Sequence, residues 1–141
     1  MIDVTQQIHA SADDVWQRIR GFGDLASWLP GVTACEVEGD GIGAIRTVSV
    51  GDGAPVQERL DAYDENQRQF SYSIVSAPGL DARANFRATV TVSPADEGSQ
   101  VRWQASFDTQ AFPAEIVDKI RLRAEAMYRA CLQHLAGLMA D

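Results

Sequence analysis

The chain has 141 residues and a formal net charge of −8, and 45% of its residues are hydrophobic. This length and composition predict one domain over residues 1–141, large enough to bury a core or a core with a cavity in it. An acidic chain without a basic cluster is a poor partner for nucleic acid or for an anionic membrane. No stretch reaches transmembrane length and the N-terminus lacks a signal-peptide pattern, so we expect a cytoplasmic protein without a membrane span.

Two cysteines and two histidines are the soft metal ligands of the chain, and they are scattered: Cys35, Cys131, His9 and His134. A structural or catalytic zinc site needs such residues in clusters, so we expect no metal. Phosphate-binding loops, zinc-protease motifs and nucleophile elbows are also missing from the sequence, and we expect no cofactor. The thiols are expected to be buried and reduced.

The N-terminal segment predicts one strand and two short helices. "IDVTQQI" alternates apolar and polar residues, as a half-buried strand does. In "SADDVWQRI", Ser11 and Asp14 have the spacing of a capping box, and helical spacing of apolar residues follows until Gly21. "FGDLASWLP" predicts a second short helix that Pro30 stops, because the residue before a proline disfavours helix.

From residue 32 onward the apolar period changes to two, which predicts successive strands. Turn-rich connections such as "EGDGIG", "GDGAP" and "PADEGS" separate them, so the strands should form an antiparallel meander. The predicted strands lie near residues 32–38, 44–50, 55–63, 68–76, 84–93 and 100–108.

The last segment, from "FPAEIVDK" to "LAGLM", predicts one long helix with Pro113 in its first turn. Its apolar residues recur at steps of three and four and define one stripe: Ile116, Ile120, Ala124, Met127, Cys131, Leu135 and Leu138. The expected fold class is therefore α+β: a curved, seven-stranded antiparallel sheet wrapped around a long C-terminal helix, with two short helices after the first strand.

Strand parity places two charges on apolar faces. Arg46 shares a face with Val48 in "IRTVSV", and Glu58 shares a face with Leu60 in "VQERL", so both should point inward. We expect Arg46, Glu58 and Tyr72 to be the reactive groups of an internal cavity. Side chains with inward parity or facing positions are expected to line it: Trp28, Val48, Leu60, Phe70, Ile74, Phe86, Trp103, Ala105, Phe107, Met127 and Cys131. Alternatively, Arg46 and Glu58 form only a structural ion pair and the aromatic residues fill the core.

Several motifs resemble the START-like, or SRPBCC, helix-grip superfamily, which includes the birch pollen allergen, abscisic-acid receptors and bacterial polyketide aromatase/cyclases. "EGDGIGAI" resembles the glycine-rich loop of the pollen-allergen group, where a positive φ is needed rather than a phosphate site. "GDGAPVQERLDAYDE" and "PGLDARANFRATVTV" resemble the gate and latch regions of the receptors. "SWLP" and "VRWQASFD" resemble aromatase/cyclase elements. The resemblance covers nearly the whole chain and is nearest to the cyclase/dehydrase-like and receptor-like members.

By this resemblance, Arg46 and Glu58 fall on ligand-pocket positions of the hormone receptors, and Phe86 falls where they carry a pocket tyrosine. The receptors' lysine anchor maps to Leu29 and their histidine-arginine-leucine latch is missing, so abscisic-acid binding is not expected. Residues 51–55 and 77–82 are expected to form a mobile cavity mouth, since Gly- and Pro-rich loops often gate ligand entry.

Three functions remain open on the sequence. The chain could bind or carry a hydrophobic polyketide, terpenoid, lipid or aromatic compound. It could instead be a cofactor-independent cyclase/dehydratase, in which Arg46 holds a carbonyl or enolate oxygen and Glu58 or Tyr72 moves protons. The third alternative is a protein-partner module, such as a chaperone-activating or regulatory member of the superfamily. A homodimer is also left open.

Overall fold

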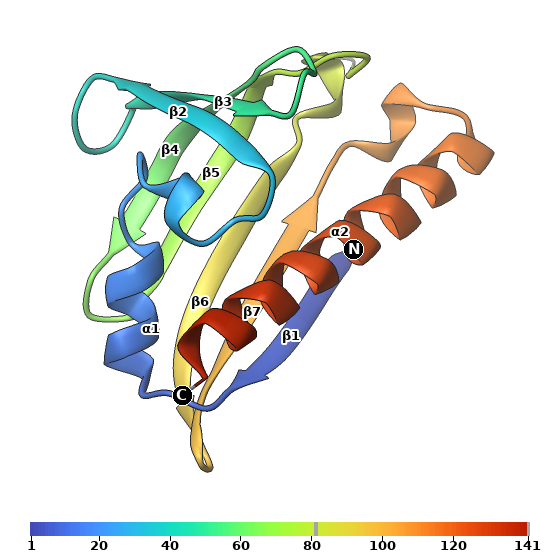
Figure 1. The fold of residues 1–141 in the computed structure, drawn as a ribbon. Helices are drawn as coiled ribbons and strands as arrows, with labels where there is room; N and C mark the ends of the chain where they lie inside the picture. Colours follow the sequence, from blue (N-terminus) through green and yellow to red (C-terminus); the bar gives the residue numbers. More distant parts are fainter. Residues whose placement is uncertain (81, 141) are drawn as a thin grey trace.

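The computed structural model describes residues 1–80 and 82–140 and contains one seven-stranded antiparallel sheet with a long helix across one face (Figure 1). The spatial strand order is β1-β7-β6-β5-β4-β3-β2, so every strand after β1 pairs with its neighbour in sequence, and β7 also pairs with β1. This arrangement confirms the predicted α+β helix-grip fold. The strands are β1 (Ile2–Ile8), β2 (Val32–Glu38), β3 (Ile45–Val50), β4 (Val56–Asp64), β5 (Gln69–Ser76), β6 (Arg87–Ala95) and β7 (Gly98–Ser106).

The first helix, α1 (Ala12–Ile19), begins as the capping pattern predicts. The side chain of Ser11 accepts a hydrogen bond from the backbone N–H of Asp14 at 3.1 Å. The predicted second helix is wrong in extent, because only a single 3₁₀ turn forms, η1 (Leu25–Ser27). Gly23 before the turn and Pro30 after it both disfavour a longer α-helix, but the turn still buries Leu25 and Trp28.

Two further 3₁₀ turns, η2 (Ala82–Ala84) and η3 (Thr109–Ala111), precede β6 and the second helix. The predicted strand 84–93 therefore starts later, at Arg87. In the glycine-rich loop before β3, Gly39, Gly41 and Gly43 all have positive φ, as expected for a turn that side chains with a Cβ would strain.

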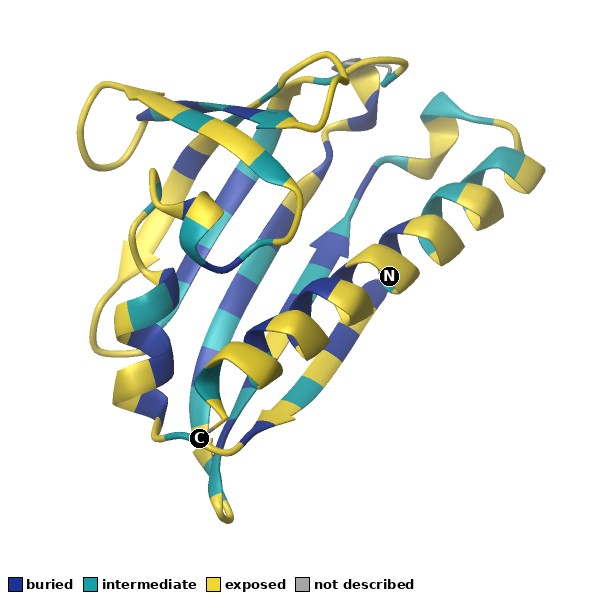
Figure 2. Ribbon diagram, in the orientation of Figure 1, coloured by how far each residue is buried: buried dark blue, intermediate teal, exposed yellow. Residues whose placement is uncertain are grey.

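The long helix α2 (Ala114–Met139) has 26 residues and runs diagonally over β7 and β1 (Figure 1). Its inward side is buried and its outward side exposed (Figure 2). The residues that α2 buries are Ala124, Tyr128, Cys131, Leu132 and Leu135. The predicted stripe was therefore wrong at two positions, because Met127 is 54% exposed and Leu138 is 40% exposed.

Register irregularities in β4 bend the sheet near its middle. The β4–β5 pairing shifts between Leu60 and Ala62 and again between Gln57 and Glu58. An extra residue on one strand of an antiparallel pair increases local bending and twist. The bend helps β2 and β3 to turn over the end of the sheet that α2 does not cover (Figure 1).

A carboxylate in one turn connects the first helix with the sheet. Glu65, in the β4–β5 connection, accepts hydrogen bonds from the Trp16 indole and, at 2.8 Å, from the Tyr63 hydroxyl. Arg20 also lies 3.3 Å from this carboxylate. These contacts lower the Glu65 pKa, with the Tyr63 hydrogen bond as the largest cause. Glu65 thus ties α1 to the sheet.

Candidate functional site

A cavity of about 200 Å³ lies among the covered face of the sheet, η1 and α2. Most of its lining is apolar, and Arg46 and Glu58 are its only charged lining side chains in the described part of the chain. Hollows of about 600 and 580 Å³ occur elsewhere, but their walls are polar, with Ser71 and Thr89 at one and Arg59 at the other. An apolar space with few polar groups is the usual form of a small-molecule site, which makes the smaller cavity the candidate.

The structure brings together most of the residues predicted to line a cavity. Those that line it are Arg46, Glu58, Tyr72, Trp28, Val48, Phe70, Ile74, Trp103, Met127 and Cys131. Met127 does so from the rim, because most of its side chain faces solvent.

Four predicted residues are buried elsewhere in the core: Leu60, Phe86, Ala105 and Phe107. The Phe86 and Phe107 rings stack on each other, with centroids 5.7 Å apart, and Phe112 packs against Phe107. These three rings fill the space beside the start of α2 with side chains. Strand alternation correctly predicted that these residues are buried. It does not indicate whether a buried side chain packs in the core or lines a cavity.

Arg46 and Glu58 form a buried ion pair across neighbouring strands. They are direct register partners in β3 and β4, so their side chains leave the same face of the sheet side by side. Nε of Arg46 donates to Oε1 of Glu58 at 2.8 Å, and Nη2 lies 2.7 Å from the same oxygen. The exposed fractions of the two side chains are 4% and 14%. The pair gives the cavity one polar end.

The guanidinium of Arg46 has further contacts beyond the carboxylate. Nη1 donates to the backbone carbonyl of Phe22 at 3.0 Å. Cζ lies 4.2 Å from the centroid of the Phe22 ring and 5.0 Å from that of Tyr72. Aromatic faces stabilise a nearby cation through their quadrupoles. These contacts fix the orientation of the Arg46 guanidinium.

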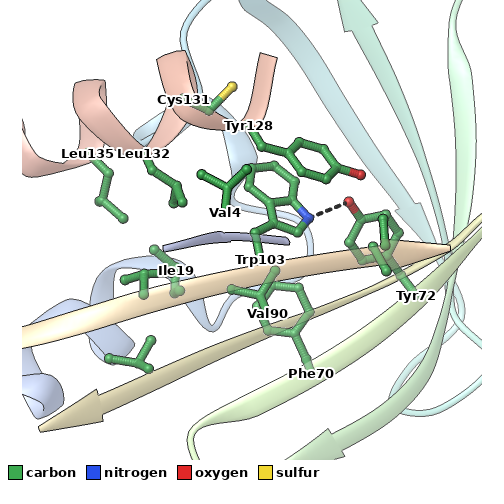
Figure 3. Packing of buried hydrophobic residues seen from close by; sticks show 14 of the residues in the cluster. Val4, Ile19, Phe70, Tyr72, Val90, Trp103, Tyr128, Cys131, Leu132 and Leu135 are labelled. Carbon is green, nitrogen blue, oxygen red and sulfur yellow. Dashed lines mark hydrogen bonds between the residues drawn. The ribbon is translucent and has the colours of Figure 1, made fainter. Parts of the chain in front are cut away.

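A cluster of aromatic side chains joins α2 to the sheet beside the cavity (Figure 3). The rings of Trp103 and Tyr128 stack with centroids 3.9 Å apart and an interplanar angle of 7°. The Trp103 indole donates to the Tyr72 hydroxyl at 3.2 Å. Burial raises the pKa of Tyr72 and of Tyr128, and a side-chain hydrogen bond with Tyr72 offsets part of the effect at Tyr128. Both phenols are therefore protonated at neutral pH and can donate hydrogen bonds or protons.

The thiols are poorly suited to nucleophilic chemistry. Burial raises the pKa of Cys131, which lines the cavity, and of Cys35 on β2. A protonated thiol is a weak nucleophile and a weak metal ligand. Within residues 1–80 and 82–140, no group of three or more His, Cys, Asp and Glu side chains is arranged to hold a metal ion. None of the helices in this part of the chain is both long and apolar enough to cross a membrane.

Sequence reasoning missed several residues at the site. Tyr128, beside Met127 in sequence, occupies the inward position on α2. The lining residues that no expectation covered are Leu25, Val50, Val56 and Val90, whereas Leu29 and Ala77 lie at the expected lysine-anchor position and mouth loop. Val50 and Val56 share the parity of Arg46 and Glu58, so strand alternation contained a signal for them. Ala77 lies in the expected loop 77–82, which its Gly and Pro residues, rather than any periodicity, marked as part of the cavity mouth.

Comparisons with known proteins agree with this geometry. A family model described as "Polyketide cyclase / dehydrase and lipid transport" matches residues 1–140. MLP-like protein 423 of Arabidopsis thaliana is 35% identical over 78 residues, which are 52% of this chain and 50% of that protein. Abscisic acid receptor PYL2 of the same plant is 34% identical over 95 residues, 64% of this chain and 49% of the receptor. The chain thus spans about half the length of these two relatives.

Solved structures match over the full length. An uncharacterized protein from Bacillus thuringiensis has a crystal structure that superimposes with a TM-score of 0.85 at 27% identity. The match covers 99% of this chain and 98% of the Bacillus chain. The arrangement of sheet and long helix is therefore shared by both chains from end to end.

Proposed function

Because the chain belongs to the polyketide cyclase / dehydrase and lipid transport family, within the START-like superfamily that its motifs resemble, we propose that it binds a small hydrophobic molecule. The observation that carries the proposal is the apolar cavity of about 200 Å³ between the sheet and α2. The names of the family and of the abscisic acid receptor support a ligand-binding role. Abscisic acid itself is a poor candidate, since Leu29 stands on the cavity wall where the receptors are expected to carry lysine.

A cavity-filling variant tests the proposal. Cys131→Phe adds a benzyl group to the cavity wall, whereas Ala130→Phe adds the same group to the exposed side of the same helix. Ethylbenzene is the probe, and binding is followed by amide chemical shifts in NMR spectra. We expect saturable binding to the wild type and to Ala130→Phe, and at least tenfold weaker binding to Cys131→Phe. Equal binding by all three proteins, or shifts remote from the cavity, would contradict the proposal.

The same cavity supports a second candidate, a cofactor-independent dehydratase or cyclase. The supporting observation is that an ion pair and a phenol with a raised pKa meet at one apolar site. Glu58 would remove the proton beside a substrate carbonyl, and Arg46 would stabilise the enolate oxygen. Tyr72 would then protonate a departing β-hydroxyl, which gives water and an unsaturated ketone, and recover its proton from Glu58. Because burial raises its pKa, the Tyr72 phenol stays protonated at neutral pH and would enter the reaction as the proton donor, not as a phenolate base.

The enzymatic role has its own test. A β-hydroxy ketone with one phenyl ring is incubated with the protein, and formation of the conjugated product is followed by ultraviolet absorbance. Tyr72→Phe should lower the rate by at least tenfold while ethylbenzene still binds, because only a hydroxyl is removed. Turnover that is absent in the wild type, or unchanged in Tyr72→Phe, argues for a binding protein without this activity.

A further inference from the structure

Most polar side-chain atoms on the cavity wall already have partners within the chain. Nε and Nη2 of Arg46 lie 2.8 and 2.7 Å from Oε1 of Glu58, and Nη1 donates to the Phe22 carbonyl at 3.0 Å. The Tyr72 hydroxyl accepts from the Trp103 indole at 3.2 Å. A ligand that used these atoms would have to replace bonds that the protein already makes, so they are poor anchors for it.

The second carboxylate oxygen of Glu58, Oε2, is the exception. Both contacts from Arg46 end on Oε1, and no hydrogen bond from residues 1–80 and 82–140 ends on Oε2. Among the buried and half-buried side chains of these ranges, only Nε1 of Trp28 and Oγ of Ser99 are both unpartnered and closed to water. Because Oε2 is unpartnered but is not one of these two atoms, a molecule of the size of water can reach it.

The strand register places the Glu58 carboxylate within the cavity wall. Its nearest neighbours on the covered face of the sheet are Arg46 across from it on β3, Ile74 across from it on β5 and Val56 two residues earlier on β4. All three line the cavity together with Glu58. The Arg46 side chain is 4% exposed and lies against two aromatic rings, whereas that of Glu58 is 14% exposed. The ion pair therefore offers the cavity an open acceptor rather than a free guanidinium.

The cavity volume limits the size of the ligand. An apolar cavity of about 150 Å³ holds one benzene molecule, whereas drug-sized ligands occupy roughly 300–1,000 Å³. The cavity here, at about 200 Å³, has room for one six-membered ring and a few further atoms. A multi-ring polyketide or a long acyl chain would require the walls to move apart.

The ion pair also limits the charge of the ligand. Arg46 and Glu58 are the only charged residues on the cavity wall among those described. An anionic ligand at Oε2 would meet the Glu58 carboxylate, and a cationic ligand would share that carboxylate with the Arg46 guanidinium, which lies 2.7 Å from Oε1. Like charges repel strongly in apolar surroundings, whereas a neutral O–H group can donate to Oε2 without adding a charge.

We propose that the ligand is an uncharged, single-ring compound with a hydroxyl group that donates a hydrogen bond to Oε2 of Glu58. This inference rests on the proposed function, because it names the ligand class of the same cavity. Glu58 is a binding and specificity residue in this assignment, and Arg46 positions the carboxylate through Oε1 so that Oε2 stays free. A hydrogen bond to an ionised acceptor is stronger than one between neutral groups, which favours ligands with a hydroxyl over plain hydrocarbons of equal shape. Water on Oε2, with no part in ligand binding, is the competing arrangement.

Four probes of nearly equal shape test the assignment. Ethylbenzene has no hydrogen-bonding group, anisole has only an acceptor, benzyl alcohol also has a donor, and benzylamine is a cation at neutral pH. Each probe is titrated into ¹⁵N-labelled protein, and its dissociation constant is taken from the amide chemical shifts in NMR spectra. In the wild type, benzylamine should bind about tenfold or more weakly than benzyl alcohol.

The variant Glu58→Gln replaces the free acceptor by a donor with almost no change of shape. Arg46 requires an acceptor, so it should hold the new amide oxygen at the place of Oε1, which leaves the amide nitrogen at the place of Oε2. The oxygens of anisole and of benzyl alcohol can both accept from this nitrogen, but the alcohol loses its bond to the carboxylate. The affinity for benzyl alcohol relative to anisole should therefore fall by about tenfold or more.

Glu36→Gln is the matched control. It removes the same charge from an exposed position on β2 that is not part of the cavity lining. It should leave the ratio of the two affinities unchanged. A second readout needs no variant: the carboxyl ¹³C resonance of Glu58, assigned through its bonds in the labelled wild type, should shift when benzyl alcohol binds and much less when anisole binds.

The outcomes separate this inference from the proposed function. If ethylbenzene, anisole and benzyl alcohol all fail to bind, the proposed function fails and the inference fails with it. If they bind but the ratio of benzyl alcohol to anisole affinity is the same in the wild type and in Glu58→Gln, Oε2 takes no part in binding and only the inference is overturned. Tighter binding of benzylamine than of benzyl alcohol would overturn the assignment to a neutral ligand. Should Glu58→Gln fail to fold, the Glu58 carboxyl resonance decides, and equal shifts with both oxygen-bearing probes would overturn the inference.

Discussion

Removing either member of the Arg46–Glu58 pair should destabilise the protein by unequal amounts. Glu58→Leu leaves a guanidinium that is only 4% exposed without its carboxylate. Breaking a buried pair from one side costs about 3–5 kcal/mol. The Phe22 carbonyl and two aromatic rings still contact Arg46, so we place the loss of unfolding free energy near the lower limit, at about 3 kcal/mol.

The reverse substitution should cost less. Arg46→Met leaves the Glu58 carboxylate, which is 14% exposed and borders the surface, so water can reach part of it. We expect a loss of about 1.5–2 kcal/mol, in the lower part of the range for a hydrogen bond to a charged group. Glu58→Gln should fall between the two, because its amide oxygen still accepts one bond from Arg46.

The double variant decides whether the pair acts as a unit. Arg46→Met with Glu58→Leu leaves no buried charge, so it should be more stable than Glu58→Leu alone. Urea denaturation, with the same m-value for all variants, measures each free energy of unfolding. In thermal unfolding, a loss of about 1 kcal/mol should lower the midpoint temperature by about 3 °C. If the two single losses add in the double variant, or if Glu58→Leu costs less than about 1 kcal/mol, the charges do not depend on each other and the argument from burial is wrong.

Two further predictions concern acid stability and the cavity mouth. Arg102 donates two hydrogen bonds to the Asp3 carboxylate, at 2.6 and 3.0 Å, and they lower the pKa of Asp3 in the folded state. This contact therefore stabilises the folded protein at pH values above the unfolded pKa of Asp3. The stabilisation is lost as pH falls through the lower folded pKa. Urea midpoints should therefore show Asp3→Asn to be slightly less stable than the wild type near neutral pH and no different below the folded pKa; an equal difference at both pH values would contradict the linkage. Amide hydrogens in residues 51–55 and 77–80 should exchange faster than those of β5 and β6, because turn bonds such as Gly53 N–H to the Val50 carbonyl, at 3.2 Å, replace the strand ladder there. Equal protection would argue against a mobile mouth; Asp81, in the same predicted loop, lies outside the described residues.

The strands and the long helix could be predicted because each buries one face, and burial leaves a period in the sequence. Strand alternation located six successive strands within a few residues and placed Arg46 and Glu58 on the same inward face. The glycines at positions 39, 41 and 43 marked a turn for a local steric reason that needs no tertiary information. Such local and periodic signals account for the part of the fold that the sequence predicts.

The cavity boundary depends on distances between elements that periodicity does not record. Phe86 and Phe107 have the same inward parity as Trp103, yet they stack on each other and fill their part of the core. On α2, the apolar spacing of three and four residues predicted that Met127 faces the sheet. In the structure the neighbouring residue Tyr128 faces the sheet instead, and its ring stacks on Trp103. Successive residues on a helix point about 100° apart around its axis. An error of one residue therefore moves a side chain from the buried face toward solvent.

The indole N–H of Trp28 has no hydrogen-bond partner among the described residues, a property that the sequence does not predict. A tryptophan in "SWLP" is expected to be buried, and burial alone does not distinguish it from Trp16 or Trp103. The distinction appears only when the hydrogen bonds of all three indoles are compared, since two are paired within the chain and one is not. Whether a buried donor finds a partner depends on which side chains the fold places beside it, and a periodic sequence pattern does not record that.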